Sequence, residues 1–489
     1  MPHRFARRTL VALLAVVTLS TATAVAKPPN ILWLHADDQR PDTIAALGNP
    51  AIITPALDGL VRRGMAFTNA YNFGGNSPAV CTPSRNMMLS GQSFFRYSRL
   101  VNAKTGETFR PQTGDPTTEE TIRTMLATGY RWNILAPGDG PNFPTAMKAA
   151  GYETYHHGKK GNTATNIQAL FDVNKYLADD QGERRTGEPG REIVDAAIAY
   201  LGHRDGARPF CMYLAFGNPH DPRVAAPSYL AMYDRAKIPL PKNYRPTPEF
   251  NNGELTVRDE RLAPWPRTED EVRRQLHEYY ATITAFDHHL GRLLAEVKRL
   301  GLEDDTIVVF SADQGLAVGS HGLFGKQNLY EHSTKLPLVV AGPGMRAGRS
   351  EALVYLFDVF PTLCEVAGTA VPNGIDGRSF RGVLAGESQT HRDVIFCAYQ
   401  QVQRAVRVGD YKLIRYPQVD RTQLFDVSSD PNETKNLADD PAQAARVAQL
   451  LQTMREQQAI YGDWQPLVVK NPQPAEFDFS RVPPEPRRK

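Results

Sequence analysis

The sequence predicts an α/β fold in which a large, mixed but mostly parallel sheet is flanked by helices. Two observations predict this class. Short apolar segments typical of buried strands alternate with segments of helical periodicity along most of the chain. The 489 residues are 41% hydrophobic and 22% charged, which is ordinary for a chain long enough to bury a large core. A small scaffold held by disulfides is excluded, since only four cysteines are present.

Residues 1–26 have the pattern of a signal peptide. Three arginines precede an apolar run at residues 10–17, and Ala24-Val25-Ala26 resembles a cleavage site. We therefore expect an exported protein, periplasmic or extracellular. This leader holds three of the 56 basic residues and none of the 53 acidic ones, so the remaining chain has a formal charge of zero. That balance argues against nucleic-acid binding, and no later stretch reaches the ~18 apolar residues of a membrane span.

The first expected strand, residues 30–35, ends just before Asp37 and Asp38. A helix follows with Thr54 as its N-cap, a proline in its first turn and Gly64 at its end. We then expect a strand at residues 65–71. Three pairs of a helix and the next strand come after it: 143–150 and 152–156, 193–201 and 210–216, and 268–300 and 306–310. Strands that alternate with helices in this way pair in parallel.

The same patterns divide the chain into domains. Residues 27–384 are expected to form the large α/β domain. Residues 385–470 are expected to form a smaller α+β domain, because short strands at 394–399, 405–408 and 411–416 precede a helix at 441–457. Residues 471–489 are a Pro-rich, charged tail. The Pro-rich stretch 220–266 predicts a surface excursion of the kind that often shapes a substrate pocket.

Polar side chains with oxygen atoms follow two of the expected strands. Asp37 and Asp38 follow the first, and Asp313 and Gln314 follow the strand at 306–310. The carboxyl ends of parallel strands form the ligand-binding edge of an α/β sheet, so these side chains are candidates for one shared site. Their oxygens suit a hard cation such as Ca²⁺ or Mg²⁺. Each pair alone is also what an ordinary turn uses, so a further signal is needed.

That signal is the segment CTPSR at residues 81–85. It resembles the Cys-x-Pro-x-Arg sequence of the type I sulfatases, enzymes of the alkaline-phosphatase-like fold in which this cysteine is oxidised to formylglycine. The resemblance extends to PNILWLHADDQRPD, GYETYHHGK, NPHDP and FSADQGLAVGSHGLFGK, and in the smaller domain to VGDYKLIRY and LFDVSSDPNETKNLAD. The spacing of Asp313, His321 and Lys326 is similar to that of iduronate-2-sulfatase-like members.

The resemblance implies a metal site, with the large domain as the catalytic one. Ca²⁺ is expected ahead of Mg²⁺, held by formylglycine formed from Cys81 and by four side chains: Asp37, Asp38, Asp313 and Gln314. Family members more often carry asparagine or histidine at position 314. Gln314 is therefore a departure, since it keeps an amide oxygen but adds a methylene.

The resemblance also implies the residues that act on the sulfate group. Arg85, Lys159 and Lys326 would offset charge on the sulfuryl oxygens, and His220 would contact the leaving-group oxygen. Many family members carry a second histidine two or three positions after the lysine that corresponds to Lys159. The present chain has Gly161 and Asn162 at these positions. His321 is the expected replacement, and one of the strand histidines at 156 and 157 is the alternative.

The resemblance thus predicts a secreted, calcium-dependent sulfatase that hydrolyses sulfate monoesters of a carbohydrate. Two alternatives stay open: a phosphonate monoester or phosphodiester hydrolase of the same fold, and a catalytically silent homologue that binds metal and glycan. The expected partners are a sulfated saccharide and a formylglycine-generating or sulfatase-maturating enzyme. The sequence leaves open the sugar, the sulfate position, exo or endo action, the oligomeric state and any disulfide among Cys211, Cys364 and Cys397.

Overall fold

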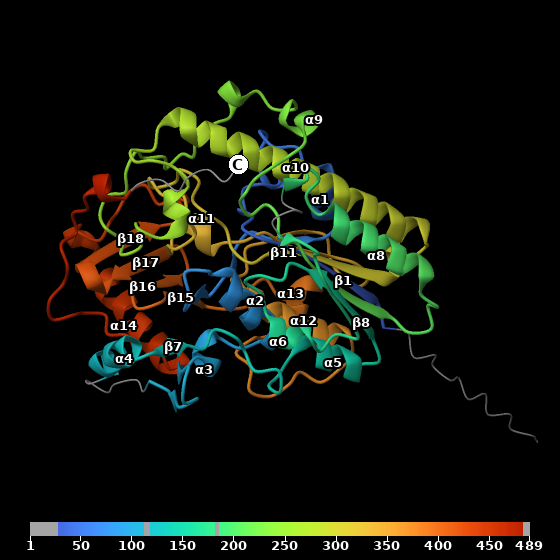
Figure 1. Ribbon diagram of the computed structural model, residues 1–489, viewed down its shortest axis with the longest axis horizontal. Helices are drawn as coiled ribbons and strands as arrows, with labels where there is room; N and C mark the ends of the chain where they lie inside the picture. The colour runs from blue at the N-terminus through green and yellow to red at the C-terminus, as the bar shows by residue number, and fades with distance from the viewer. Residues whose placement is uncertain (1–27, 112–117, 181–184, 483–489) are drawn as a thin grey trace, which may run out of the picture.

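The computed structural model describes residues 28–111, 118–180 and 185–482 (Figure 1). The expected signal peptide, residues 1–26, and the last seven residues of the expected tail lie outside this part of the chain. No helix within the described residues is long and apolar enough to cross a membrane. All four cysteines are buried and free, so none of them forms a disulfide.

An eight-stranded sheet forms the centre of the molecule, which confirms the predicted fold class. Its order is β13-β2-β12-β11-β1-β10-β8-β9. The parallel part comprises β11 (Thr306–Ala312), β1 (Asn30–Ala36), β10 (Phe210–Ala215), β8 (Glu153–Gly158) and β9 (Val173–Tyr176). The other edge comprises β12 (Leu338–Ala341) and β2 (Met65–Phe67), which pair in antiparallel fashion, and β13 (Gly348–Ser350). Every residue of β1 is buried, as expected for a strand covered on both faces.

Helices cover both faces of this sheet (Figure 1). One layer contains α1 (Pro55–Arg63), α8 (Arg191–His203) and α10 (Glu269–Arg299), which pack on one another. The other contains α2 (Cys81–Ser90), α5 (Phe143–Ala149), α6 (Thr165–Gln168) and α12 (Val359–Val366). α10 starts where the sequence predicts a helix, and Thr268 is its N-cap, since Thr268 Oγ1 accepts a hydrogen bond from the Glu271 N–H at 3.2 Å.

A second, five-stranded sheet follows in the C-terminal part of the chain. It comprises β18 (Arg421–Asp426), β17 (Tyr411–Tyr416), β16 (Gln403–Val408), β15 (Val394–Tyr399) and β4 (Gly74–Gly75), and α14 (Ala444–Tyr461) packs against it. The edge strand β4 comes from the N-terminal region and pairs in parallel with β15. Gly74 is required there, because its φ is +103° and a Cβ atom would lie 2.0 Å from the carbonyl oxygen of Ala398.

The predicted strand at 65–71 is wrong in one respect, because it consists of two strands. A turn at residues 68–69 ends β2, and β3 (Ala70–Tyr71) then pairs with β14 (Val354–Tyr355) in a separate sheet. A third small sheet, β6 (Thr108–Phe109), β5 (Leu100–Asn102) and β7 (Tyr130–Trp132), carries α4 (Thr118–Ala127). Other short α-helices of the described residues are α3 (Phe94–Tyr97), α9 (Pro227–Leu230), α11 (Glu331–Thr334) and α13 (Arg381–Leu384).

Candidate active site

Two neighbouring strands bring the acidic residues together. Asp37 and Asp38 follow β1, and Asp313 and Gln314 follow β11, which is the parallel neighbour of β1. The backbone N–H of Asp38 donates to Oδ1 of Asp313 at 3.0 Å. The strand ends are therefore linked directly, as the sequence pattern predicts for adjacent parallel strands.

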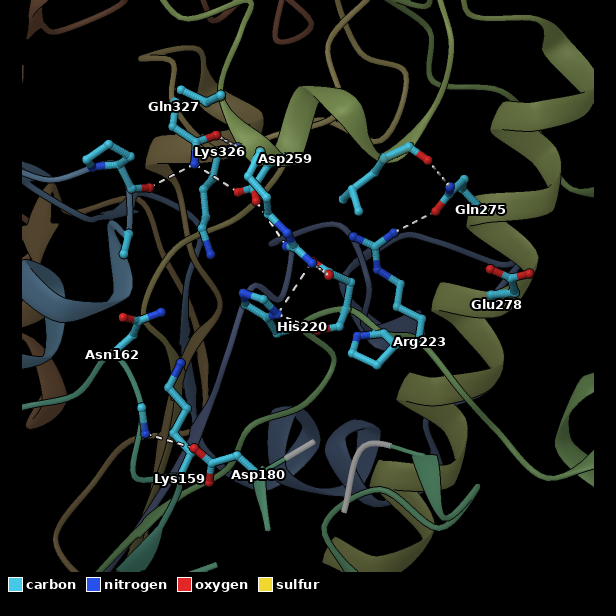
Figure 2. Close-up of a pocket in the computed structure, with 18 of the residues that line it drawn as sticks. Lys159, Asn162, Asp180, His220, Arg223, Asp259, Gln275, Glu278, Lys326 and Gln327 are labelled. Carbon is cyan, nitrogen blue, oxygen red and sulfur yellow. Dashed lines mark hydrogen bonds and ion pairs between the residues drawn. The ribbon is translucent and has the colours of Figure 1, made fainter. Parts of the chain in front are cut away.

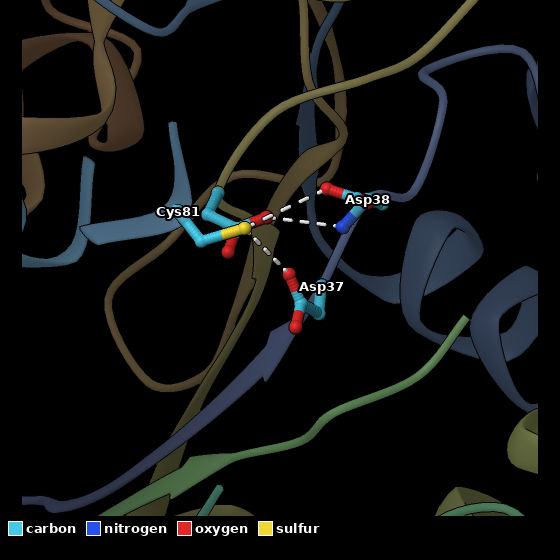
Figure 3. A group of neighbouring side chains, drawn as sticks. Asp37, Asp38 and Cys81 are labelled. Carbon is cyan, nitrogen blue, oxygen red and sulfur yellow. Dashed lines mark hydrogen bonds between the residues drawn. The ribbon is translucent and has the colours of Figure 1, made fainter. Parts of the chain in front are cut away.

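Cys81 is the first residue of α2 and faces these aspartates (Figure 3). Its Sγ atom lies 3.1 Å from Oδ1 of Asp37 and 3.8 Å from Oδ1 of Asp38. Candidate ligand atoms of Cys81 and the three aspartates all lie within 4.8 Å of one another, and the four residues are buried. We call these four residues, together with Gln314, the acidic cluster. Nε2 of Gln314 lies 2.5 Å from Oδ1 of Asp38 and 3.1 Å from the Cys81 sulfur.

Polar contacts within the CTPSR segment fix α2 against the end of β11. Oγ of Ser84 donates to the carbonyl oxygen of Asp313 at 2.7 Å. Nε of Arg85 lies 3.0 Å from Oδ2 of Asp313, and its Nη2 donates to the carbonyl oxygen of Phe216 at 3.0 Å. Asn72 also donates to the Asp313 carbonyl, at 2.9 Å, and its role was not predicted. The position of Cys81 is thus tied to the metal-site carboxylates through its own helix.

Two lysines approach the acidic cluster from other elements. Lys159 directly follows β8, and its Nζ contacts Oδ2 of Asp37. Nζ of Lys326 lies 2.7 and 2.8 Å from the two carboxylate oxygens of Asp38 and 3.1 Å from the Cys81 sulfur. With Arg85, three cations face three carboxylates. The charge of a bound divalent cation would therefore remain available to attract an anionic ester.

The electrostatics of the acidic cluster favour a bound cation. Burial alone would raise the pKa of Asp37, but Lys159 and Arg85 hold it well below its usual range. Burial, reinforced by Asp37, raises the pKa of Asp313 to about 7. The buried Oε1 atom of Gln314 accepts no hydrogen bond from any described residue. The carboxylate oxygens in this arrangement fit a hard divalent cation, and Gln314 would add its amide oxygen if its side-chain amide were turned to exchange Nε2 for Oε1.

The Cys81 thiol itself is not activated. Burial raises its pKa well above the usual value, and the charge of Asp37 acts in the same direction. The thiol is thus protonated at neutral pH and is a weak nucleophile. This environment suits a side chain that reacts only after conversion to another functional group.

His220 lies in the loop after β10, at the edge of the acidic cluster. Its Nε2 atom is 3.6 Å from Oδ2 of Asp38, and its Nδ1–H donates to the carbonyl oxygen of Asp221 at 2.7 Å. Burial and Lys326 lower the pKa of His220. Among the described histidines, only His220 has a ring nitrogen within 4 Å of a carboxylate in the cluster.

The structure does not bring His321 to the acidic cluster. Its ring stacks on Tyr330 with centroids 3.9 Å apart, and its backbone N–H donates to Asn243. The Tyr330 hydroxyl in turn donates to Oε1 of Gln423 in β18 of the five-stranded sheet. The spacing between Asp313 and Lys326 suggested proximity, but the loop between them folds so that His321 packs toward the C-terminal sheet.

The strand histidines also lie apart from the cluster. Nδ1 of His156 bonds to Asn174 at 2.7 Å, and its ring stacks on Tyr213. The side chain of His157 alternates to the opposite face of β8, where burial and, to a smaller extent, Lys175 lower its pKa. Neither histidine has a described contact with Cys81 or the aspartates.

A pocket of about 650 Å³ opens next to the cluster (Figure 2). Lys159, His220 and Lys326 line one part of it, and Arg223, Gln275 and Glu278 line another. All three residues of the first group are predicted from sequence motifs. The second group is not, although Arg223 lies in the Pro-rich stretch expected to shape a pocket.

Comparison with known proteins agrees with this geometry. The model of the sulfatase family matches residues 29–369, and the model described as N-sulphoglucosamine sulphohydrolase, C-terminal, matches residues 319–460. The chain therefore belongs to the sulfatase family and is a sulfuric ester hydrolase. Membership implies a formylglycine and a divalent metal, and the acidic cluster provides a site whose donors fit that metal.

Individual relatives are similar over most of their length. The chain is 26% identical to an N-acetylglucosamine-6-O-sulfatase of Bacteroides thetaiotaomicron, over 90% of this chain and 88% of that protein. This chain is also similar to a solved structure of a protein bound to its substrate, D-glucosamine-2-N,6-O-disulfate. The two chains superpose with a TM-score of 0.69 at 24% identity, over 90% of this chain and 99% of that one. A phosphonate monoester hydrolase from Silicibacter pomeroyi gives a TM-score of 0.68 at 22% identity, with coverage of 89% and 96%.

Proposed function

We propose that this protein hydrolyses sulfate monoesters of a carbohydrate, using a formylglycine formed from Cys81 and a bound Ca²⁺. The observation that carries the proposal is the distance of 3.1 Å between the Cys81 sulfur and Oδ1 of Asp37, within a buried group of three carboxylates. A sulfatase needs its nucleophile beside the cation that binds the sulfuryl oxygens. The sulfur atom stands in here for the oxygen that replaces it on oxidation.

The side chains around position 81 have distinct proposed roles. Asp37, Asp38, Asp313 and Gln314 would hold the cation, which lowers the charge on the sulfuryl oxygens. The hydrated aldehyde at position 81 would supply one hydroxyl to attack sulfur as the sugar oxygen leaves, and deprotonation of its other hydroxyl would expel sulfate and restore the aldehyde. The buried cations Arg85, Lys159 and Lys326 would bind the remaining sulfuryl oxygens, each already within reach of the cluster.

His220 is the proposed proton donor to the leaving group. Because its Nδ1–H is used by the Asp221 carbonyl, Nε2 is the atom left to face the substrate. A proton on Nε2 would be held by Asp38 until the leaving oxygen takes it. No second histidine is proposed for breakdown of the sulfated intermediate, since His321 packs elsewhere.

The choice of Ca²⁺ over Mg²⁺ rests on the donor set. Several anionic and amide oxygens from the protein suit Ca²⁺, which accepts six to eight oxygen ligands at flexible geometry. Mg²⁺ prefers to keep several waters, and the ligand side chains here are almost completely buried. Apart from Cys81 itself, the possible ligands grouped here among the described residues are carboxylates, with no imidazole and no second thiol, so a softer metal is disfavoured.

The carbohydrate substrate is supported by the relatives, two of which are described by sulfated glucosamine substrates. The spacing of Asp313 and Lys326 adds the narrower proposal of an iduronate-2-sulfatase-like member. Export, with maturation of Cys81 by a formylglycine-generating or sulfatase-maturating enzyme, is proposed from residues 1–26 and the CTPSR segment.

The alternative substrate class is a phosphonate monoester or phosphodiester, because a phosphonate monoester hydrolase has a similar fold. Matched aryl esters test this directly. The purified, converted protein should hydrolyse 4-nitrophenyl sulfate with a higher kcat/KM than phenyl phosphonate esters or bis(4-nitrophenyl) phosphate. A preference for the phosphorus esters would contradict the proposal.

A further inference from the structure

Arg223 is a buried cation of the pocket whose bonding is incomplete. It lies three residues after His220, is 7% exposed, and points its guanidinium into the pocket (Figure 2). Nη1 donates to Oε1 of Gln275 at 3.0 Å. Nε and Nη2 are buried and have no hydrogen-bond partner among the described residues. Because unsatisfied buried donors are costly, these atoms point to a ligand.

The other cations of the pocket already have carboxylate partners. These pairs are Lys159 with Asp37, Lys326 with Asp38, Arg258 with Asp221 and Asp259, and Arg274 with Glu271 and Glu278. Among the described residues, Arg223 hydrogen-bonds only to the neutral amide of Gln275, and the Asp221 carboxylate, whose pKa Arg223 helps to lower, is already ion-paired with Arg258. Within the described part of this pocket, its charge is therefore the one left for an anion from outside the protein.

The place of Arg223 relative to the acidic cluster is set by Tyr279 of α10. The guanidinium lies over the Tyr279 ring, 5.2 Å from its centroid, and the Tyr279 hydroxyl donates to the carbonyl oxygen of Asp38 at 2.7 Å. One tyrosine side chain thus separates Arg223 from a proposed metal ligand. In Figure 2, His220 lies between Arg223 and the two lysines. An anion on Arg223 would therefore belong to the part of the substrate beyond the leaving oxygen.

We propose that Arg223 binds a second anionic group of the substrate, either a carboxylate or a further sulfate on the sugar that bears the hydrolysed ester. This inference rests on the proposed function and adds a substrate class to it. Nε and Nη2 form one edge of the guanidinium, which presents two parallel N–H groups to two oxygens of one oxyanion. Arg223 contacts the substrate away from the reacting sulfur and acts on specificity.

Matched substrates test this with the wild-type protein. The series contains monosulfated hexoses, the same sugars with a second sulfate and, where the first sulfate is not on O6, the same sugars oxidised to uronic acids. We expect kcat/KM to be about tenfold higher for at least one of the two dianionic forms, mainly through KM, as one charged hydrogen-bonded contact provides. The form that gains identifies the anion. If neither form is favoured, the inference is overturned.

Variants assign the effect to Arg223. Arg223→Gln should reduce the dianion advantage to less than about twofold, and Arg223→Lys, which keeps the charge but loses the fork, should retain part of it. Arg274→Gln is the matched control, because it removes a pocket cation that carboxylates already neutralise, and should retain the whole advantage. An advantage that survives in Arg223→Gln overturns the inference.

If Arg223→Gln does not fold, Arg223→Lys and the wild-type series decide. Failure of the proposed function looks different, since no member of the series would then release sulfate.

Discussion

The sulfur of Cys81 lies 3.1 Å from Oδ1 of Asp37, and neither side chain is accessible to solvent. This contact raises the pKa of the thiol together with burial, so the unmodified cysteine is held in its unreactive form. The same contact places whatever replaces the sulfur directly beside the proposed metal. The chemistry at position 81 therefore depends on covalent conversion.

Conversion of Cys81 is the first testable consequence. Protein from an expression host that contains a maturation enzyme should give a peptide containing residue 81 that is roughly 18 Da lighter than the unmodified peptide, as expected for thiol to aldehyde. Cys81→Ala should abolish sulfate release, because no nucleophile remains. The mass is measured on the peptide and the activity with 4-nitrophenyl sulfate. Turnover by protein with an unshifted mass would contradict this role.

Removal of the metal should abolish activity and lower stability. Dialysis against a chelator is expected to stop sulfate release and to lower the thermal midpoint, and Ca²⁺ should restore both. At 100 times its Kd, the ion would stabilise the protein by about 2.7 kcal/mol. Asp313→Asn should lose this calcium-dependent shift. Asp305→Asn, an exposed acid just before the opposite end of β11, should keep it. Full activity after chelation would exclude the proposed site.

Two lysines give a matched pair for the active site. Nζ of Lys326 bonds to Asp38 and the Cys81 sulfur, whereas Nζ of Lys335 bonds to Glu331 at 2.9 Å. Lys326→Ala should lower kcat/KM at least about 100-fold, within the range seen when one electrostatic contact to a transition state is lost. Lys335→Ala should retain most turnover. Equal losses would show that Lys326 has no special role in the reaction.

A buried ion pair holds the segment after α14 against the five-stranded sheet. Nε and Nη2 of Arg404, on β16, lie 2.6 and 2.8 Å from the carboxylate of Asp463, and both side chains are buried. Arg404→Met should destabilise the protein by about 3–5 kcal/mol, because it leaves the buried Asp463 carboxylate without a charged partner. Arg63→Met, which breaks a surface pair with Glu303, should cost less than about 1 kcal/mol. Unfolding in urea measures both, and similar losses would contradict the argument.

The alternation of strands and helices was predictable because the two elements leave different patterns in the sequence. A buried strand is a short continuous apolar run, whereas an amphipathic helix repeats its apolar residues every three or four positions. The meeting of Asp37 with Asp313 was predictable for the same reason, since the ends of adjacent parallel strands share an edge. The strand at Gly74–Gly75 was not, because two glycines carry no hydrophobic pattern. Their pairing with β15 depends on how the two sheets approach each other.

The sequence could not show either that Arg223 would have no ion-paired carboxylate among the described residues. The hydrogen bonding of Arg223 depends on which carboxylates form ion pairs with the other cations of the pocket. It also depends on the contact with Gln275, which lies on α10, 52 residues later in the chain. His321 shows the converse case. Its position between Asp313 and Lys326 in the sequence suggested a shared site, but its backbone N–H donates to the carbonyl oxygen of Asn243 and its ring stacks on Tyr330.

The two histidines make a final prediction that separates spacing in the sequence from proximity in space. His220→Ala should lower kcat strongly for esters with poor leaving groups and much less for 4-nitrophenyl sulfate, whose leaving oxygen needs no proton. His321→Ala should leave this leaving-group dependence as in the wild type and instead lower the thermal midpoint, because it removes a ring stacked on Tyr330. A loss of kcat in His321→Ala with an unchanged midpoint would mean that the loop brings this ring to the substrate during turnover.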